Sequence, residues 1–117
     1  YLQYAHARIQ SIFRRAGIES PDAIDRIVIS APAERALALA VLEFPGVVAE
    51  IEQGMQFHRL AAYLFSLATT FTGFYEQCPV LKAEGQVRES RLALCALTAR
   101  ILATGLDLLG IEAPEQL

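Results

Sequence analysis

Apolar residues recur at alternating steps of three and four throughout the last long segment of this chain, from about Val87 to Leu109. The first row consists of Leu92, Cys95, Ala99, Leu102, Leu106 and Leu109, and a second row beside it of Leu94, Leu97, Ile101 and Leu108. Such spacing places each row on one face of an α-helix and is typical of a helix-bundle seam. Because there are two rows, we expect neighbours to cover this helix on more than one side, at the centre of a bundle.

Proline and glycine divide the rest of the chain into further helical segments, and no stretch alternates apolar and polar residues long enough to predict a strand. The expected helices cover about residues 1–16, 20–29, 30–44, 45–54 and 56–77. We therefore predict an all-α helical bundle of about five helices, in a single domain spanning residues 1–117. Gly73 and Gly105 fall inside two long helices, where glycine is unfavourable, so we interpret both as positions of close packing, with a local kink as the alternative.

The composition excludes several classes of protein. Hydrophobic residues make up 54% of the chain and charged residues 20%, which excludes a disordered tail. Polar residues interrupt the apolar runs before they reach membrane-spanning length, so we expect no membrane association. Cys78 and Cys95 are too few for a disulfide framework and read as small buried hydrophobic residues. With no secretory signal at its start, the chain is expected in the cytoplasm.

Patterns that carry catalysis or metal binding are missing from the sequence. There is no GxGxxG, GxxxxGK[ST], HExxH or GxSxG motif. His6 and His58 are single histidines on predicted helices, and Asp22 with Asp25 reads more simply as a first-turn charge and a solvated face. We therefore expect no cofactor, no metal and no catalytic residue in this chain, which by itself is not a complete enzyme.

The first helix carries an aromatic and basic stripe beside its core face. At 100° per residue, the core face is formed by Leu2, Ala5, Ile9, Ile12, Phe13 and Ala16. The stripe lies roughly 110° away and contains Tyr1, Tyr4, Arg8, Ser11 and Arg15. Rings and a guanidinium that project together suit unpaired nucleotides, because aromatic faces stack on bases and arginine binds phosphate or a base edge. The alternative is that these tyrosines are core-edge residues with their hydroxyls in water.

Charge supports the nucleotide interpretation without deciding it. The net charge is −3, but residues 1–17 contain three arginines and no acid, and residues 82–100 are also net positive. Positive charge is thus confined to two segments, and the more basic one coincides with the tyrosine stripe.

Longer stretches of the sequence resemble a known family. The segment YLQYAHARIQSIFRRAG is similar to the opening helix of the α-helical DALR-type anticodon-binding domain of arginyl-tRNA synthetases, the class I aminoacyl-tRNA synthetase type. The segments AERALALAVLEFP, FYEQCPVL and ESRLALCALTARILATGLDLLGIEAPEQL resemble that family's second major helix and closing helices. The resemblance covers essentially all 117 residues.

This resemblance implies that the chain is the tRNA-reading module of an arginine–tRNA ligase, an enzyme that uses ATP to attach arginine to its tRNA. The catalytic domain of the same protein, which takes ATP with Mg and arginine, would then lie outside this fragment. The family's anticodon contacts map onto Tyr1, Tyr4, Arg8, Tyr75 and the terminal residue, here Leu117 where the family commonly has methionine.

We accordingly predict a cleft between the start of the first helix and the C-terminal segment. All six arginine codons have G in the middle, so arginine anticodons share a central cytosine, which such a cleft would read by its Watson–Crick edge. Arg15, Arg88 and Arg91 are candidates for the tRNA backbone, although ordinary solvated arginines explain Arg88 and Arg91 equally well. Two other classes remain open on the residues alone: a helical protein–protein interaction or dimerisation module, and a small-molecule-binding bundle.

Overall fold

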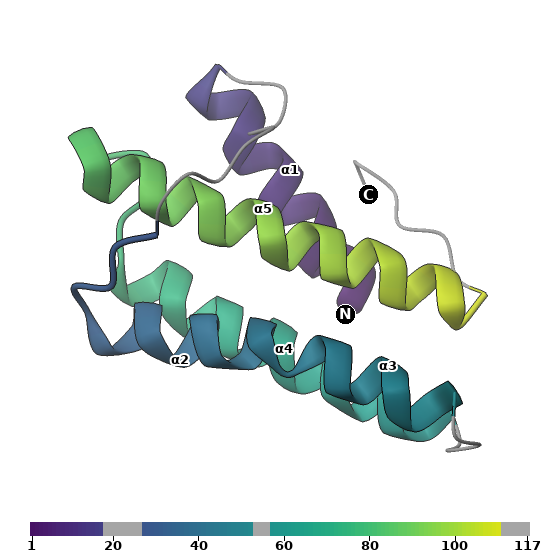
Figure 1. The fold of residues 1–117 in the computed structure, drawn as a ribbon. Coiled ribbons are helices and arrows are strands. Elements are labelled where there is room, and N and C mark those ends of the chain that lie inside the picture. The colour runs from purple at the N-terminus through teal and green to yellow at the C-terminus, as the bar shows by residue number, and fades with distance from the viewer. Residues whose placement is uncertain (18–26, 53–56, 111–117) are drawn as a thin grey trace.

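A computed structural model describes residues 1–17, 27–52 and 57–110, and these ranges contain helices and no strand (Figure 1). The helices are α1 (Leu2–Ala16), α2 (Pro32–Leu42), α3 (Phe44–Glu52), α4 (Phe57–Gln77) and α5 (Gly85–Leu108). The predicted all-α bundle is confirmed, and each of these helices begins and ends within about two residues of the position expected from the sequence. None of the described helices is both long enough and apolar enough to cross a membrane.

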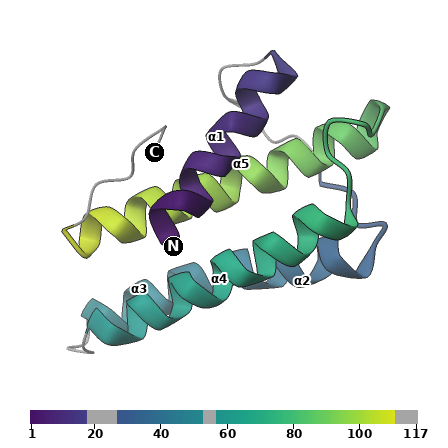
Figure 2. The same ribbon diagram turned by 180° about the vertical axis from the view of Figure 1, so that it is seen from behind.

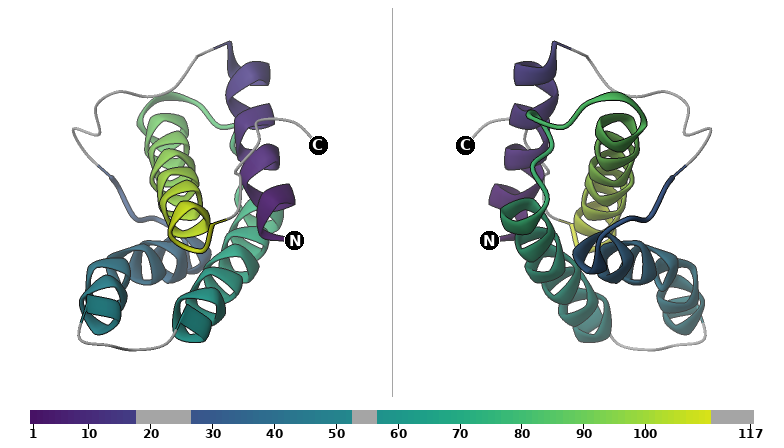
Figure 3. Two further views of the ribbon diagram at one scale, coloured as in Figure 1. Left: turned by 90° about the vertical axis from the view of Figure 1, so that its right-hand side faces the viewer. Right: turned by 90° about the vertical axis from the view of Figure 1, so that its left-hand side faces the viewer.

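The helices form two layers, one of α2, α3 and α4 and the other of α5 and α1 (Figure 1). α2 and α3 follow one another in line with only Glu43 between them, and α4 runs back antiparallel beside both (Figure 1). α5 packs against α2 and α4, and α1 crosses α5 on its other side (Figure 3). The first turn of α1 also reaches α4, so the start of the described chain lies against the middle of that helix (Figure 2). This crossing of α1 and α4 positions the candidate site.

Local chemistry explains where the helices begin and end. α1 ends at Gly17, whose φ of 78° is left-handed and lets its N–H donate to the Arg14 carbonyl at 3.2 Å. Arg14 and Arg15 occupy the last turn of α1, where positive charge is favourable. α2 begins at Pro32, whose fixed φ suits a first helical position.

The central position predicted for the last helix is confirmed. Of its first apolar row, Leu92, Cys95, Ala99, Leu102 and Leu106 are buried, and Leu94 and Ile101 of the second row are buried as well. Leu97 and Leu109 are half-buried, while Leu108 at the end of α5 is exposed. Both rows therefore face protein along most of α5, which is why this helix shows little amphipathic contrast.

The short helix expected over residues 20–29 is wrong for its last part. Residues 18–26 lie outside the described residues, and Ile27–Ile29 are not helical. The reason is Ser90 on α5: its hydroxyl oxygen accepts from the Val28 N–H at 2.8 Å and the hydroxyl donates to the Val28 carbonyl at 3.0 Å. The side chain takes both backbone groups that a helix would have used, and it holds this segment against α5.

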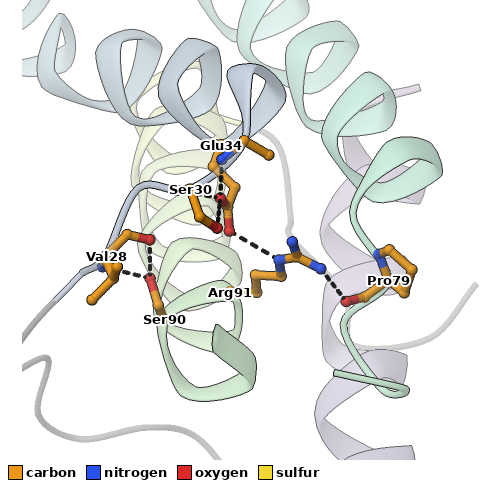
Figure 4. A network of polar contacts seen from close by, with 7 residues as sticks. Val28, Ser30, Glu34, Pro79, Ser90 and Arg91 are labelled. Carbon is orange, nitrogen blue, oxygen red and sulfur yellow. Dashed lines mark hydrogen bonds and ion pairs between the residues drawn. The ribbon is translucent and has the colours of Figure 1, made fainter. Parts of the chain in front are cut away.

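A buried carboxylate joins three segments that are far apart in the sequence (Figure 4). Glu34 on α2 is fully buried and accepts from the Ser30 and Ala31 N–H groups at 2.8 and 2.7 Å. It also accepts from Nε of Arg91 on α5 at 2.9 Å, and Nη1 of Arg91 donates to the Pro79 carbonyl at 2.8 Å. Burial alone raises the pKa of Glu34, but the bonds from Arg91, Ser30 and Ala31 outweigh it and hold the pKa below its ordinary value.

The two helical glycines differ from one another. A Cβ on Gly105 would lie 2.5 Å from Cδ1 of Leu64, so the prediction of close packing is confirmed there. A Cβ on Gly73 would meet no atom within 4 Å, so the same interpretation is wrong for Gly73. Spacing along a helix locates a glycine but says nothing of what lies opposite it.

Both cysteines are buried and unpaired, as expected of small hydrophobic residues. Burial raises the pKa of Cys95 to about 12 and also raises that of Cys78. His6 is buried on α1, whereas His58 at the start of α4 is exposed. The described residues contain no group of three or more histidine, cysteine or acidic side chains that could hold a metal ion.

Candidate functional site

The tyrosine and arginine stripe on α1 faces solvent. Ala5, Ile9, Ile12 and Phe13 on the predicted core face are buried. Tyr1 and Tyr4 are 56% and 68% exposed, and Arg8 and Arg15 are exposed as well. The amphipathic division predicted from helical spacing is therefore confirmed, and the two phenol rings are available to a ligand.

α4 brings a third tyrosine to the same place. The guanidinium carbon of Arg8 lies 5.8 Å from the centroid of the Tyr75 ring, within the range of a cation–π contact. Tyr75 itself is half-buried and stacks on Phe71 with centroids 6.2 Å apart and ring planes 19° apart. Because Phe71 is fully buried, it anchors Tyr75, which in turn orients Arg8. The structure thus places Arg8 and Tyr75 together, as the predicted grouping requires.

Tyr1 is fixed to α4 by two further residues that the sequence did not single out. Its hydroxyl lies 3.4 Å from Oγ1 of Thr72, and its ring centroid lies 5.2 Å from that of Phe65. A signal for both was present in the spacing, since Phe65 and Thr72 are seven residues apart and so share a face of α4. That face lies off the buried row formed by Leu60, Leu64, Leu67, Phe71 and Phe74.

These residues form a surface at the crossing of α1 and α4, where Tyr1 contacts Phe65 and Thr72 and Arg8 contacts Tyr75, with the exposed Tyr4 between Tyr1 and Arg8 along α1. We call it the α1–α4 aromatic surface, and it consists of Tyr1, Tyr4, Arg8, Phe65, Thr72 and Tyr75. It offers rings, hydroxyls and one cation, and the group contains neither a carboxylate nor a histidine or cysteine. Such groups are suited to stacking and hydrogen bonding.

The other four predicted contacts differ from one another. Arg15 is exposed, and within the part of the chain that the structure describes its guanidinium lies 3.5 Å from Oγ of Ser11. Arg88 is half-buried, and its Nε is enclosed with no hydrogen-bond partner among the described residues. Arg91 is mostly buried and is held within the protein: its Nε donates to Glu34 and its Nη1 to the Pro79 carbonyl, which gives it a structural role. Leu117 lies outside the described residues.

Comparison with known proteins identifies the fold. The sequence profile of the DALR anticodon binding domain matches residues 2–117. This chain belongs to that family. The resemblance found in the sequence is confirmed, and the α1–α4 aromatic surface is a surface of a DALR domain.

Similar proteins are ligases several times longer than this DALR domain. The chain is 56% identical over 118 residues to arginine–tRNA ligase of Thermobifida fusca, with all of the chain and 20% of that protein covered. It is 53% identical to arginine–tRNA ligase of Chromobacterium violaceum, with the same coverage. The chain thus spans about a fifth of the length of the curated relatives it matches.

Solved structures agree with the sequence comparison. The DALR domain superposes on Thermus thermophilus arginyl-tRNA synthetase with a TM-score of 0.87 and 43% identity, covering all of this chain and 21% of that one. For arginyl-tRNA synthetase from Plasmodium falciparum the TM-score is 0.87 and the identity 38%, with the same coverage. The arrangement of helices is therefore that of a domain within arginyl-tRNA synthetases.

Proposed function

We propose that this DALR domain binds the anticodon loop of a tRNA for arginine, as part of a cytoplasmic arginine–tRNA ligase. The ligase would join arginine to that tRNA using ATP with Mg in a catalytic domain elsewhere in the same protein. The relatives named arginine–tRNA ligase and the fifth of their length that the chain spans support this division of labour. The two buried free cysteines fit a reducing compartment.

The observation that carries the proposal is the exposed α1–α4 aromatic surface. Tyr1 and Tyr4 present their rings one helical turn apart, with Arg8 held beside them on Tyr75. Unpaired bases stack on such rings for about 1–3 kcal/mol each, and they do so with little regard to base identity. Arginine anticodons share a central cytosine while their flanking bases vary. Tolerant stacking of the neighbours and hydrogen bonding to the cytosine edge would serve all of them.

Tyr4→Ala in the full-length ligase tests this proposal. Loss of one stacking ring should raise the KM for tRNA about tenfold or more, which corresponds to at least about 1.4 kcal/mol. ATP–pyrophosphate exchange, which needs ATP and arginine, should be unchanged, because the residue acts only at the anticodon. Both activities are measured on the same enzyme preparation. Equal damage to both would show that Tyr4 is structural and would contradict the proposal.

Phe57→Ala is the matched control for this experiment. Phe57 is also an aromatic residue with its side chain 56% exposed, but it lies at the start of α4, two turns before the α1–α4 aromatic surface. Its removal should leave the KM for tRNA unchanged. A second experiment replaces the central cytosine of the anticodon, which should weaken binding to the wild-type ligase. Equal affinity for both anticodon loops would show that the ligase does not recognise that base.

A further inference from the structure

The geometry points to Phe65 as a further RNA-binding residue: we propose that it stacks on an unpaired base of the anticodon loop beside Tyr1. The inference rests on the proposed function, since it assumes that RNA reaches the α1–α4 aromatic surface. It adds a residue from α4 to the binding face. A base held at Phe65 would neighbour one held at Tyr1, and the loop would then be bound by both helices.

Exposure and contact distinguish Phe65 from an ordinary surface residue. A single exposed phenylalanine does not indicate a binding site, because much of any protein surface is apolar. Phe65, however, is 57% exposed although it touches Tyr1, which is 56% exposed itself. The two ring planes are inclined by 47°, so neither ring covers the other. The pair therefore offers two differently oriented aromatic faces to one ligand.

Thr72 fixes the orientation of this pair. Its hydroxyl donates to the Ala68 carbonyl at 3.1 Å, so its oxygen accepts the hydrogen of the Tyr1 hydroxyl, 3.4 Å away. Tyr1 is thereby tied to α4 at its hydroxyl and packed on Phe65 at its ring. Because the Tyr1 ring is already ordered, binding of a ligand here costs less side-chain entropy than binding to a ring that is free to rotate.

The surface is continuous from Phe65 to the cation. Phe65 and Thr72 share one face of α4, and Tyr75 lies between that face and the buried row of the helix. Arg8 contacts the Tyr75 ring, so a positive charge lies next to the aromatic rings of this surface. Rings next to a cation favour an anionic chain with aromatic bases over an apolar peptide, which would gain nothing from the guanidinium.

The test uses the full-length ligase and an anticodon stem-loop with 2-aminopurine at each unpaired loop position in turn. Stacking on a protein ring quenches the fluorescence of this base. Phe65→Leu should weaken binding about tenfold and relieve quenching at one loop position, because leucine keeps the apolar bulk but has no aromatic face. Phe65→Ala should do the same. The control Phe57→Leu should change neither affinity nor quenching.

Each other result overturns the inference in a recognisable way. If Phe65→Leu binds like wild type while Phe65→Ala binds weakly, Phe65 merely supports Tyr1. If neither variant changes binding while Tyr4→Ala does, the RNA does not reach Phe65, for example because another part of the ligase covers it, and only this inference fails. If the wild-type ligase does not bind the stem-loop, or Tyr4→Ala has no effect either, the proposed function itself has failed.

Discussion

Gly105 and Gly73 occupy equivalent interior positions of two long helices, yet they face different surroundings. Gly105 on α5 is buried against Leu64 on α4, whose side chain leaves no space for a methyl group. Gly73 on α4 has open space where its Cβ would be, and neither residue has a positive φ. Substitution by alanine at each position therefore separates the effect of helix propensity, which both share, from the effect of packing, which only Gly105 has.

We expect the two substitutions to change stability in opposite directions. Gly73→Ala should raise the free energy of unfolding by about 0.5–1 kcal/mol, because alanine restricts the unfolded chain and meets no obstacle in the helix. Gly105→Ala gains the same propensity but overpacks the core, which costs about 1–3 kcal/mol, so it should lower the free energy of unfolding by roughly 1 kcal/mol. Urea unfolding of both variants measures the difference. Stabilisation by both would mean that Leu64 moves away without cost.

At the residue scale, the sequence predicted which side of a helix a side chain occupies but not its partner. The stripe of Tyr1, Tyr4 and Arg8 followed from the period of the helix and is exposed as predicted. Phe65 was missed because its contact with Tyr1 depends on how two helices cross. Periodicity along a single helix contains no information on crossing geometry.

At the scale of elements, Glu34 and Arg91 connect α2, α5 and the segment after α4. The pair is nearly enclosed, whereas Glu50 and Arg59, 3.1 Å apart, form a pair whose side chains are 42% and 38% exposed. Removal of one partner of a buried pair leaves the other charge without compensation, while an exposed charge is rehydrated. The domain thus offers an internal comparison between two carboxylates with arginine partners.

Glu34→Ala should lower the free energy of unfolding by about 3–5 kcal/mol, because it leaves Arg91 uncompensated and the Ser30 and Ala31 N–H groups unbonded. Glu50→Ala, the matched control, should cost less than about 1 kcal/mol. Both are measured by urea unfolding at neutral pH. A similar small loss in both variants would show that the Glu34 network contributes no more than a surface pair.

The same network predicts how stability depends on pH. The pKa of Glu34 in the folded state lies below its ordinary value of 4.5, so the unfolded chain binds the proton more tightly than the folded one. This contribution is fully present above about pH 4.5 and is lost as the pH falls through the folded-state pKa. Wild type should therefore lose more stability than Glu34→Gln between neutral and acidic pH, as measured by unfolding at a series of pH values. Parallel pH profiles for the two proteins would contradict this assignment.

At the scale of elements, the sequence predicted the helices but not the polar contacts that join them. Helix positions followed from proline, glycine and apolar spacing, because these act within one segment. The non-helical Val28 and the structural role of Arg91 were not predicted, since each depends on a partner about 60 residues away, Ser90 and Glu34 respectively. Long-range polar contacts become visible only once the helices are packed.

At the scale of the whole molecule, charge is distributed unevenly. The chain has a net charge of −3, yet the 17 residues that include α1 carry three arginines and no acid. Because screening limits electrostatic attraction to about 8–10 Å at ordinary ionic strength, an anionic ligand at α1 responds mainly to charges within that distance, and these three arginines are among them. The net negative charge of the chain therefore does not by itself oppose the proposed binding of RNA at α1.

This distribution predicts a salt dependence that one arginine can change. Binding of the anticodon stem-loop to the full-length ligase should weaken as salt is raised, because each phosphate contact releases counterions. Arg15→Gln should reduce the slope of log K against log salt by roughly 0.7–0.9, the contribution of a single contact, and leave the preference for a central cytosine intact. Arg35→Gln is the matched control, since Arg35 is an exposed arginine on α2, away from α1. Titrations at several salt concentrations measure the slopes, and equal slopes for all three proteins would mean that α1 does not contact the RNA backbone through Arg15.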